Sequence, residues 1–211
     1  MRKTMLVLAA AATAAALAAP AQAQFMVRAR AVYLDPVNKS DAIGALAVPA
    51  DKITVNSKWI PEVDISYFFT RNIAAELVLT YPQKQEVTIE QSALGGPTKI
   101  GTFKHLPPSL MAQWHFIPDG KFQPYVGAGI NYTRIMSVKL TVPTVGDLKL
   151  ENDSWGPAFQ VGMDIPIARN HFINFDFKKV YIQSDVFLNG SKISNVKIDP
   201  YLWGIGYGYR F

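Results

Sequence analysis

Residues that could carry out catalysis are few in this chain of 211 residues, which has three histidines and no cysteine. The lack of cysteine excludes disulfides and thiolate chemistry. His105 and Ser109 share one face of an expected strand, but residues four apart on a strand lie about 13 Å apart, too far for a nucleophile and its base. We expect His115 and His171, near strand ends, to meet water. Neither Gly-x-Ser-x-Gly, a metal-spaced histidine pair nor a phosphate loop occurs. We therefore expect no catalytic residue, metal or cofactor, and no enzyme.

Charged residues offer a different chemistry, because several recur two positions apart within otherwise apolar stretches. Arg28 and Arg30 form one such pair, and Asp176 and Lys178 another. Residues two apart on a strand point to the same face, so opposite charges from several strands would meet inside a closed sheet. We predict a polar plug in that interior, made of Arg28, Arg30, Glu62, Asp64, Glu76, Asp164, Asp176 and Lys178. The alternative is that these charges only satisfy one another and stabilise the fold.

The alternation that would position these charges is clearest in the last dozen residues. Tyr201, Trp203, Ile205, Tyr207, Tyr209 and Phe211 fall on one parity, whereas three glycines, Leu202 and Arg210 fall on the other. Such a strand has a wide apolar outside and a narrow inside, which suits lipid. The same test predicts eight strands, near 24–35, 58–69, 73–81, 104–116, 122–136, 155–165, 173–179 and 200–211. Beyond Lys179 the alternation changes phase, as a β-bulge would cause.

Short and long connections alternate between these strands. The short turns fall near 70–72, 118–121 and 166–170; the long loops span 35–57, 83–103 and 137–153, and one centres on Asn189-Gly190. Open strand edges cannot stay unpaired in hydrocarbon, so the sheet must close. The prediction is an all-β fold, an eight-stranded antiparallel transmembrane β-barrel with three short periplasmic turns and four longer extracellular loops.

The N-terminus indicates export. Arg2 and Lys3 precede an apolar run over residues 5–19, and Ala21-Gln22-Ala23 is a small-x-small cleavage site. Residues 1–23 are predicted to be a cleaved signal peptide, because the run is short for a membrane anchor and Pro20 follows it. Residues 24–211 then form the barrel, with the bacterial outer membrane as its expected location. The mature net charge is 5 − 2 = +3, which is scattered along the chain and gives no reason to expect nucleic acid.

Several stretches in chain order resemble one family. They are residues 104–114, which contain His105-Leu106-Pro107-Pro108, then Pro124-Tyr125-Val126-Gly127-Ala128-Gly129, Asp153-Ser154-Trp155-Gly156, and the ending from Asp199-Pro200 to Phe211. Together they resemble the OmpW family of small bacterial outer-membrane proteins over the whole mature chain. The resemblance implies an eight-stranded barrel whose narrow, partly hydrophobic lumen passes small apolar molecules.

The interior of such a barrel is expected to change from charged to apolar along its axis. Eight strands leave room for side chains or one small ligand, not for an aqueous pore. Val78 lies two residues beyond Glu76, and Val180 two beyond Lys178. We hypothesise that Val78, Met111 and Val180 form a hydrophobic gate, the alternative being ordinary packing. Ile60, Phe68, Ile182 and Leu202 are the other apolar residues expected to face inward.

Pro107-Pro108 breaks the rules for strands, because proline supplies no amide donor to a ladder and a closed barrel has no edge for it. We predict a ladder gap at these residues, which would give a lateral exit from the lumen to lipid. The alternative is that both prolines lie above the hydrocarbon, where the strand merely ends.

The function predicted from these features is passive passage of small hydrophobic molecules. The alternative is a surface-binding, receptor or envelope-integrity barrel that acts through its long loops, the first of which holds Ile43, Leu46, Val48 and Ile53. Such apolar residues would dock a ligand or fold over the barrel mouth. The expected partners are outer-membrane lipids, small hydrophobic solutes, and the barrel-assembly machinery through the C-terminal Phe211.

Overall fold

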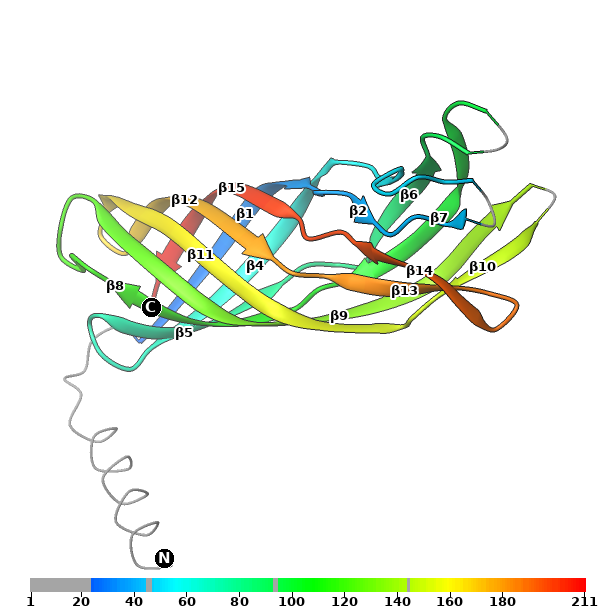
Figure 1. Ribbon diagram of the computed structural model, residues 1–211. Coiled ribbons are helices and arrows are strands. Elements are labelled where there is room, and N and C mark those ends of the chain that lie inside the picture. The colour runs from blue at the N-terminus through cyan, green and yellow to red at the C-terminus, as the bar shows by residue number, and fades with distance from the viewer. Residues whose placement is uncertain (1–23, 45–46, 93–94, 144) are drawn as a thin grey trace, which may run out of the picture.

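A closed ring of eight antiparallel strands forms the body of the molecule (Figure 1). The computed structural model describes residues 24–44, 47–92, 95–143 and 145–211, so the expected signal peptide and Leu46 lie outside the described residues. Around the ring the order is β11, β12, β15, β1, β4, β5, β8 and β9, and β9 pairs with β11 to close it. Within these residues, no helix has the length and apolar character that crossing a membrane requires.

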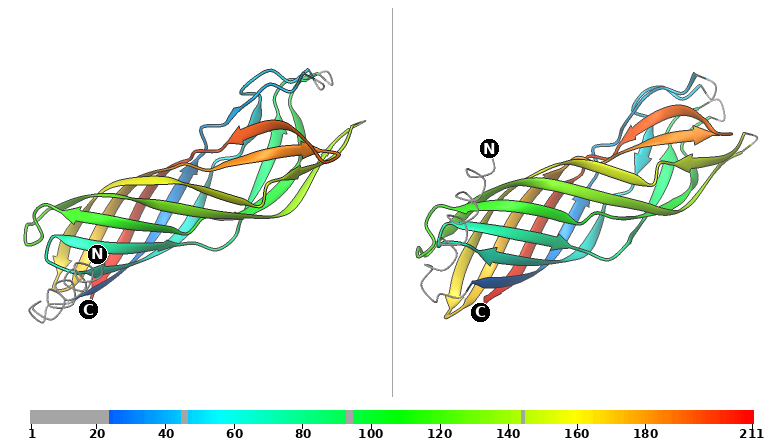
Figure 2. Two further views of the ribbon diagram at one scale, coloured as in Figure 1. Left: turned by 60° about the horizontal axis from the view of Figure 1, so that its bottom comes forward. Right: turned by 90° about the horizontal axis from the view of Figure 1, so that it is seen from below.

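The strands of the ring match the predicted ones within a few residues, apart from the two corrections given below. They are β1 (Phe25–Asp35), β4 (Lys58–Phe68), β5 (Ile73–Leu79), β8 (Ser109–His115), β9 (Gln123–Val142), β11 (Asp153–Ala168), β12 (His171–Val180) and β15 (Tyr201–Arg210). The first and last strands pair from Met26↔Arg210 to Asp35↔Tyr201. The Phe211 amide then donates to the Phe25 carbonyl at 2.8 Å. The predicted closure is confirmed, and the start of β1 lies beside the end of β15 near the short turns (Figure 2).

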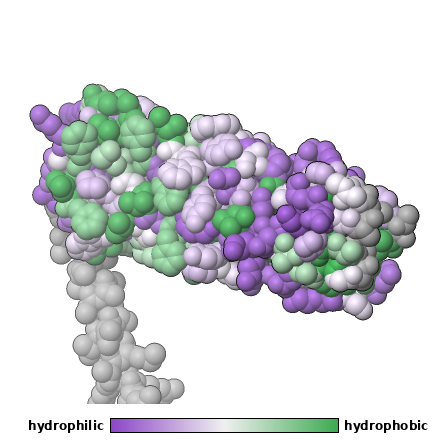
Figure 3. All heavy atoms as spheres, turned by 45° about the horizontal axis from the view of Figure 1, so that its top comes forward, coloured by the Kyte–Doolittle hydropathy of each residue, from purple (hydrophilic) through white to green (hydrophobic). Residues whose placement is uncertain are grey.

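The outside of the ring is apolar, as the alternation predicts. Trp203, Phe159 and Leu77 are 54%, 52% and 39% exposed. Aromatic pairs lie at both ends of this lipid-facing band, with Tyr132 beside Trp155 at the extracellular end and Phe25 beside Tyr67 at the periplasmic end. Hydrophobic side chains gather over the half that carries the short turns, whereas hydrophilic ones predominate over the other half (Figure 3). This distribution places the short-turn half in the bilayer.

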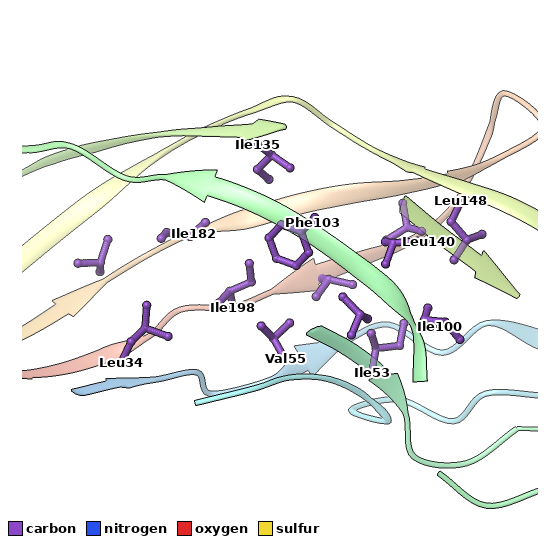
Figure 4. Packing of buried hydrophobic residues seen from close by; sticks show 14 of the residues in the cluster. Leu34, Ile53, Val55, Ile100, Phe103, Ile135, Leu140, Leu148, Ile182 and Ile198 are labelled. Carbon is purple, nitrogen blue, oxygen red and sulfur yellow. The ribbon is translucent and has the colours of Figure 1, made fainter. Parts of the chain in front are cut away.

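The long connections are more regular than expected, because they extend the wall as further strands. These are β2 (Lys39–Ser40), β3 (Ile53–Val55), β6 (Gln83–Ile89), β7 (Thr98–Leu106), β10 (Gly146–Leu150), β13 (Gln183–Leu188) and β14 (Ser191–Lys197). The hairpin of β13 and β14 turns at Asn189-Gly190, where both residues have positive φ, as a tight two-residue turn requires. Apolar side chains from these strands fill the space they enclose (Figure 4). Ile43, Val48 and Ile53 of the first loop are buried in this filling.

Two expectations about the strands need correction. The strand predicted over 104–116 is interrupted, because β7 ends at Leu106 and β8 begins at Ser109. The change of phase beyond Lys179 is not a bulge, since the described pairs of β12 keep one register with β15. Instead β12 ends at Val180, and β13 starts at Gln183 with different partners. Both errors arise where the barrel wall meets its extracellular extension.

Candidate functional site

The lumen of the lipid-embedded half is filled by buried ion pairs. The Arg28 guanidinium lies 2.7 Å from a Glu76 carboxylate oxygen and 2.5 Å from an Asp164 oxygen, and its Nε donates to the other Asp164 oxygen at 3.0 Å. Its Nη1 also donates to the Ser66 hydroxyl at 2.7 Å. All four side chains are fully buried. A two-point contact between arginine and carboxylate fixes both groups geometrically.

A second set of pairs lies beside the first. Arg30 Nη1 is 2.5 Å from Asp64 and 3.2 Å from Glu62. Lys178 joins Glu62 at 2.7 Å and Asp176 at 2.5 Å. Arg30 also lies 3.9 Å from Glu76, which links the two sets. The structure therefore brings all eight predicted plug residues into one buried network of three cations and five carboxylates. Side chains fill this level of the barrel, as expected for eight strands.

Uncharged groups complete the network, and sequence reasoning did not single them out. The Tyr125 hydroxyl donates to Asp176 at 2.8 Å and accepts from Arg30 at 3.1 Å. Gln160 Nε2 donates to Glu76 at 2.9 Å and to Asp176 at 2.8 Å. A signal for Tyr125 existed, because Gly162 lies opposite it in the register and a Cβ there would sit 2.3 Å from the tyrosine ring. A large inward residue facing a glycine indicates a side chain that crosses the lumen.

An apolar seal lies below the plug, at the periplasmic end. It consists of Met26, Phe68, Ala74 and Phe172. The Arg210 guanidinium lies 4.2 Å from the centre of the Phe68 ring, as in a cation–π contact. His115 stacks against Tyr125 at 5.0 Å and is fully buried, so the expectation that it meets water is wrong. His115 lies between the Tyr125 ring, opposite it on the neighbouring strand β9, and the Phe68 ring on β4, which explains the difference. His171 is partly exposed, and its ring lies beside Tyr207 and Tyr209.

Above the plug lies a small cavity, here called the inner cavity, which is lined by Val78, His105, Pro107, Ser109, Val180 and Leu202, among others. Two of the three predicted gate residues, Val78 and Val180, share it. Met111 lies deeper, paired with Glu76 and Gly129, so the three residues do not form one ring. The inner cavity has a volume of only about 20 Å³. That is room for one or two waters.

A second cavity, the upper cavity, lies within the extracellular extension. Its lining includes Ile53, Val87, Ile100, Phe103 and Ile135, and Ser184 is the only polar side chain among the described lining residues. Its volume is about 30 Å³. Several of its lining residues are labelled in Figure 4, where they project into the space between the strands. The lumen therefore changes from charged to apolar above the plug.

The wall is interrupted beside the inner cavity. The β5–β8 ladder ends at Val78↔Ser109, and pairing resumes as β6–β7 at Gln83↔His105. Pro107 and Pro108 take part in neither ladder. On the other side they stay attached to β9, since the Tyr132 amide donates to the Pro108 carbonyl at 3.0 Å. The ladder is thus open toward β5 and held toward β9.

The outer surface is hollowed at this interruption. This outer groove is lined by Leu77, Pro108, Ser109, Leu110, Ile130, Tyr132 and Trp155. Leu110 and Ile130 belong to the lipid-facing band, being 53% and 55% exposed, and Trp155 belongs to the extracellular aromatic pair. Ser109 lines both the inner cavity and the outer groove. Ser109 is therefore the residue that separates the inner cavity from the outer groove.

A closed eight-stranded barrel with a lipid-facing apolar band and an ion-paired interior defines a small outer-membrane β-barrel protein. Within that class the chain belongs to the OmpW family, whose sequence model matches residues 21–211. It is 41% identical over 170 residues to the uncharacterized outer-membrane protein y4mB of Sinorhizobium fredii, covering 78% of this chain and 71% of that protein. It is 32% identical over 198 residues to outer membrane protein W of Vibrio cholerae, covering 90% and 89%. The crystal structure of OprG from Pseudomonas aeruginosa superposes with a TM-score of 0.77 at 27% identity, covering 90% of this chain and 96% of that one.

Proposed function

We propose that this protein admits small hydrophobic molecules passively into its lumen from the extracellular side and releases them sideways into the outer membrane. The observation that carries the proposal is the position of Ser109 between the inner cavity and the lipid-facing outer groove. Pro107 lines the first and Pro108 the second. Solute released there would enter the bilayer directly.

The plug and the seal argue against onward passage to the periplasm. A solute moving that way would have to separate Arg28 from Glu76 and Asp164, all fully buried. Separating a buried ion pair leaves uncompensated charge, at a cost of several kcal/mol. Beyond the plug it would meet the packed side chains of Met26, Phe68, Ala74 and Phe172. A sideways path avoids both barriers.

The proline gap lowers the barrier on the sideways path. Opening an intact barrel wall would break backbone hydrogen bonds inside hydrocarbon, where no water replaces them. Neither Pro107 nor Pro108 has an amide hydrogen, so the β5 side of this segment has no donor to lose. Since the inner cavity holds only one or two waters, solute passage requires side chains such as Val78 and Val180 to move. In this proposal they are the gate.

Charge placed in the gate tests the path. In intact Gram-negative cells, the rate at which the apolar dye 1-N-phenylnaphthylamine reaches the inner leaflet and fluoresces measures uptake. We expect Val78→Lys and Val180→Asp to slow uptake to the level of cells without the protein, because a charged side chain at either valine makes the gate unfavourable for an apolar dye. Ser191→Lys, at an exposed turn, is the matched control and should leave uptake unchanged. Normal uptake with both gate variants would remove the gate.

The sideways step needs its own test, which the absence of native cysteine makes clean. A cysteine at Ser109, labelled with a bulky methanethiosulfonate reagent, should block the gap, and dithiothreitol should restore uptake. Ala112→Cys, on the lipid-facing side of the same strand, is the control for labelling. If a blocked Ser109→Cys barrel still takes up dye at the normal rate, release does not occur at the gap.

The alternative, a surface-binding, receptor or envelope-integrity barrel, predicts a different outcome. The first loop gives it little support, because Ile43, Val48 and Ile53 are buried in the barrel mouth and not displayed to a partner. Cells whose dye uptake is unaffected by the protein, but whose envelope becomes detergent-sensitive without it, would favour an envelope role.

A further inference from the structure

Two glutamines and a histidine point into the mainly apolar half of the lumen. Gln83 and Gln85 lie on β6 and His105 on β7, with His105 directly opposite Gln83 in the register. All three side chains are fully buried. Gln85 lies two residues along the same face as Gln83, opposite Phe103. We call these three residues the polar triad.

Most hydrogen-bonding atoms of the polar triad have no partner among the described residues. This holds for both ring nitrogens of His105, for both amide atoms of Gln85 and for Oε1 of Gln83. Gln83 Nε2 is the exception, since it donates to the Thr80 hydroxyl at 3.2 Å and to the Tyr81 carbonyl at 3.0 Å. Buried polar groups left without a partner cost stability. Three neighbours on one face in this state point to a ligand that supplies the partners.

The surroundings show what kind of ligand this is. His105 lines the inner cavity together with Val78 and Pro107. The Phe103 ring, whose centre is 5.9 Å from the His105 ring, lines the upper cavity. Within the polar triad, His105 therefore lines the inner cavity, and Gln83 and Gln85 lie opposite His105 and Phe103 in the register. A molecule bound there would have its polar end at the triad and its apolar part against aliphatic side chains.

The charge of the site selects among polar ends. β7 lies above the lipid-facing band, and burial, with the positive charge of Lys58 nearby, lowers the pKa of His105 to about 4. At neutral pH the imidazole then has one donor and one acceptor, and Gln85 offers both as well. The cation that lines the inner cavity, Lys178, is already paired with Glu62 and Asp176, and Lys58 donates to the Lys84 carbonyl. A carboxylate would therefore arrive here without a free cation to pair with, at a large desolvation cost. An uncharged group that both donates and accepts, such as a hydroxyl, matches the site.

We propose that Gln83, Gln85 and His105 bind the uncharged polar end of an amphiphilic solute, an alcohol or carbonyl compound with an alkyl or aryl tail, as it passes through the lumen. This inference rests on the proposed function and names its substrate class. Hydrocarbons would pass without this binding step, and fatty-acid anions would be excluded. Because the two cavities together hold only a few waters, the solute binds when the gate side chains move apart.

Binding is tested directly on the side chains. The full barrel, labelled with ¹⁵N in glutamine and histidine side chains and placed in lipid nanodiscs, is titrated with 1-decanol, decane or decanoate. We expect 1-decanol alone to shift the side-chain signals of Gln83, Gln85 and His105 in a saturable manner. The signal of Gln123, a buried glutamine at the periplasmic end whose Oε1 also lacks a partner in the described chain, should stay fixed. Unmoved triad signals under saturating 1-decanol would mean that water alone occupies the site, which overturns the inference.

Transport separates this inference from the function beneath it. Cells expressing the protein should take up 1-decanol about threefold to tenfold faster than decane, after correction for cells without it, because one net hydrogen bond corresponds to that range. Gln85→Met and His105→Phe should remove the preference, and Gln123→Met should keep it. Equal uptake of both solutes by the native barrel overturns the polar triad alone. If neither solute is taken up above background, the proposed function itself fails.

Discussion

Replacing Arg28 with leucine tests how much the plug contributes to the barrel. The arginine is fully buried and pairs with Glu76 at 2.7 Å and with Asp164 at 2.5 Å. Leucine leaves both carboxylates in a low-dielectric interior without this partner. Asp164 keeps one hydrogen bond, from Asn174 at 2.8 Å. Glu76 keeps hydrogen bonds from Ser66 at 2.8 Å and Gln160 at 2.9 Å, and a distant Arg30 at 3.9 Å. Breaking a buried pair in this way typically costs about 3–5 kcal/mol of unfolding free energy.

The assay is urea unfolding in lipid vesicles, followed by tryptophan fluorescence and by the gel mobility of the folded barrel. Arg71→Leu is the matched control, because its pair with Asp119 is exposed at 53% and 66%, and such pairs contribute only about 0–1 kcal/mol. The triple variant Arg28→Leu, Glu76→Gln, Asp164→Asn should recover most of the loss, since it leaves no unpaired charge. The reasoning is refuted if Arg28→Leu loses no more stability than Arg71→Leu, or if the triple variant is as unstable as the single one.

Three further predictions follow from individual residues. The folded pKa of His105, about 4, lies below its ordinary value of 6.5, so the unfolded chain binds more protons between these values. As the pH falls from 6.5 to 4, the free energy of unfolding should therefore fall by about 3 kcal/mol more in the native protein than in His105→Phe. Urea titration of both proteins at several pH values measures this difference. Ile205→Lys, on the lipid face, should cost about 2–4 kcal/mol in the same assay, whereas Thr141→Lys above the band should cost little. If Phe211 contacts the assembly machinery, Phe211→Ala should reduce the fraction of folded barrel in isolated outer membranes. The urea midpoint of the refolded protein should not change. An unchanged membrane fraction would contradict that role.

Much of the plug could be predicted from sequence because two constraints act together. Alternation along each strand decides which side chains face inward, and Arg28, Glu76 and Asp164 come from three different strands of the ring. The narrow interior of an eight-stranded barrel then forces inward charges into contact. Parity and lumen volume were therefore enough to name the eight charged members without a structure. They were not enough to name Tyr125, whose reach across the lumen depends on the space at Gly162.

Height along the barrel axis was harder to predict, because parity gives the face of a strand but not the stagger between strands. Met111 and Val78 both face inward, yet Met111 lies beside Glu76 while Val78 lines the inner cavity. His115 was misjudged for the same reason, since its burial depends on Phe68 and Tyr125 from other strands. The polar outward faces of the extracellular hairpins favour loops in a sequence analysis, although Val87 and Ile89 alternate as strand residues do.

The vertical order of the lumen bears on the direction of transport. Apart from the polar triad, a solute descending from the mouth meets mainly apolar side chains until it reaches the level of Val78 and Val180. Burial there favours each methylene by about 0.8 kcal/mol. One step further it would meet Glu62 and Lys178, which line the same cavity and are already joined at 2.7 Å. There an alkyl chain would have to displace paired charges, whereas the outer groove at Pro108 and Leu110 offers continuous apolar surface. Under the proposed function, the plug therefore acts by making the gap beside Ser109 the path of lowest free energy, and weakening it should redirect solute toward the periplasm.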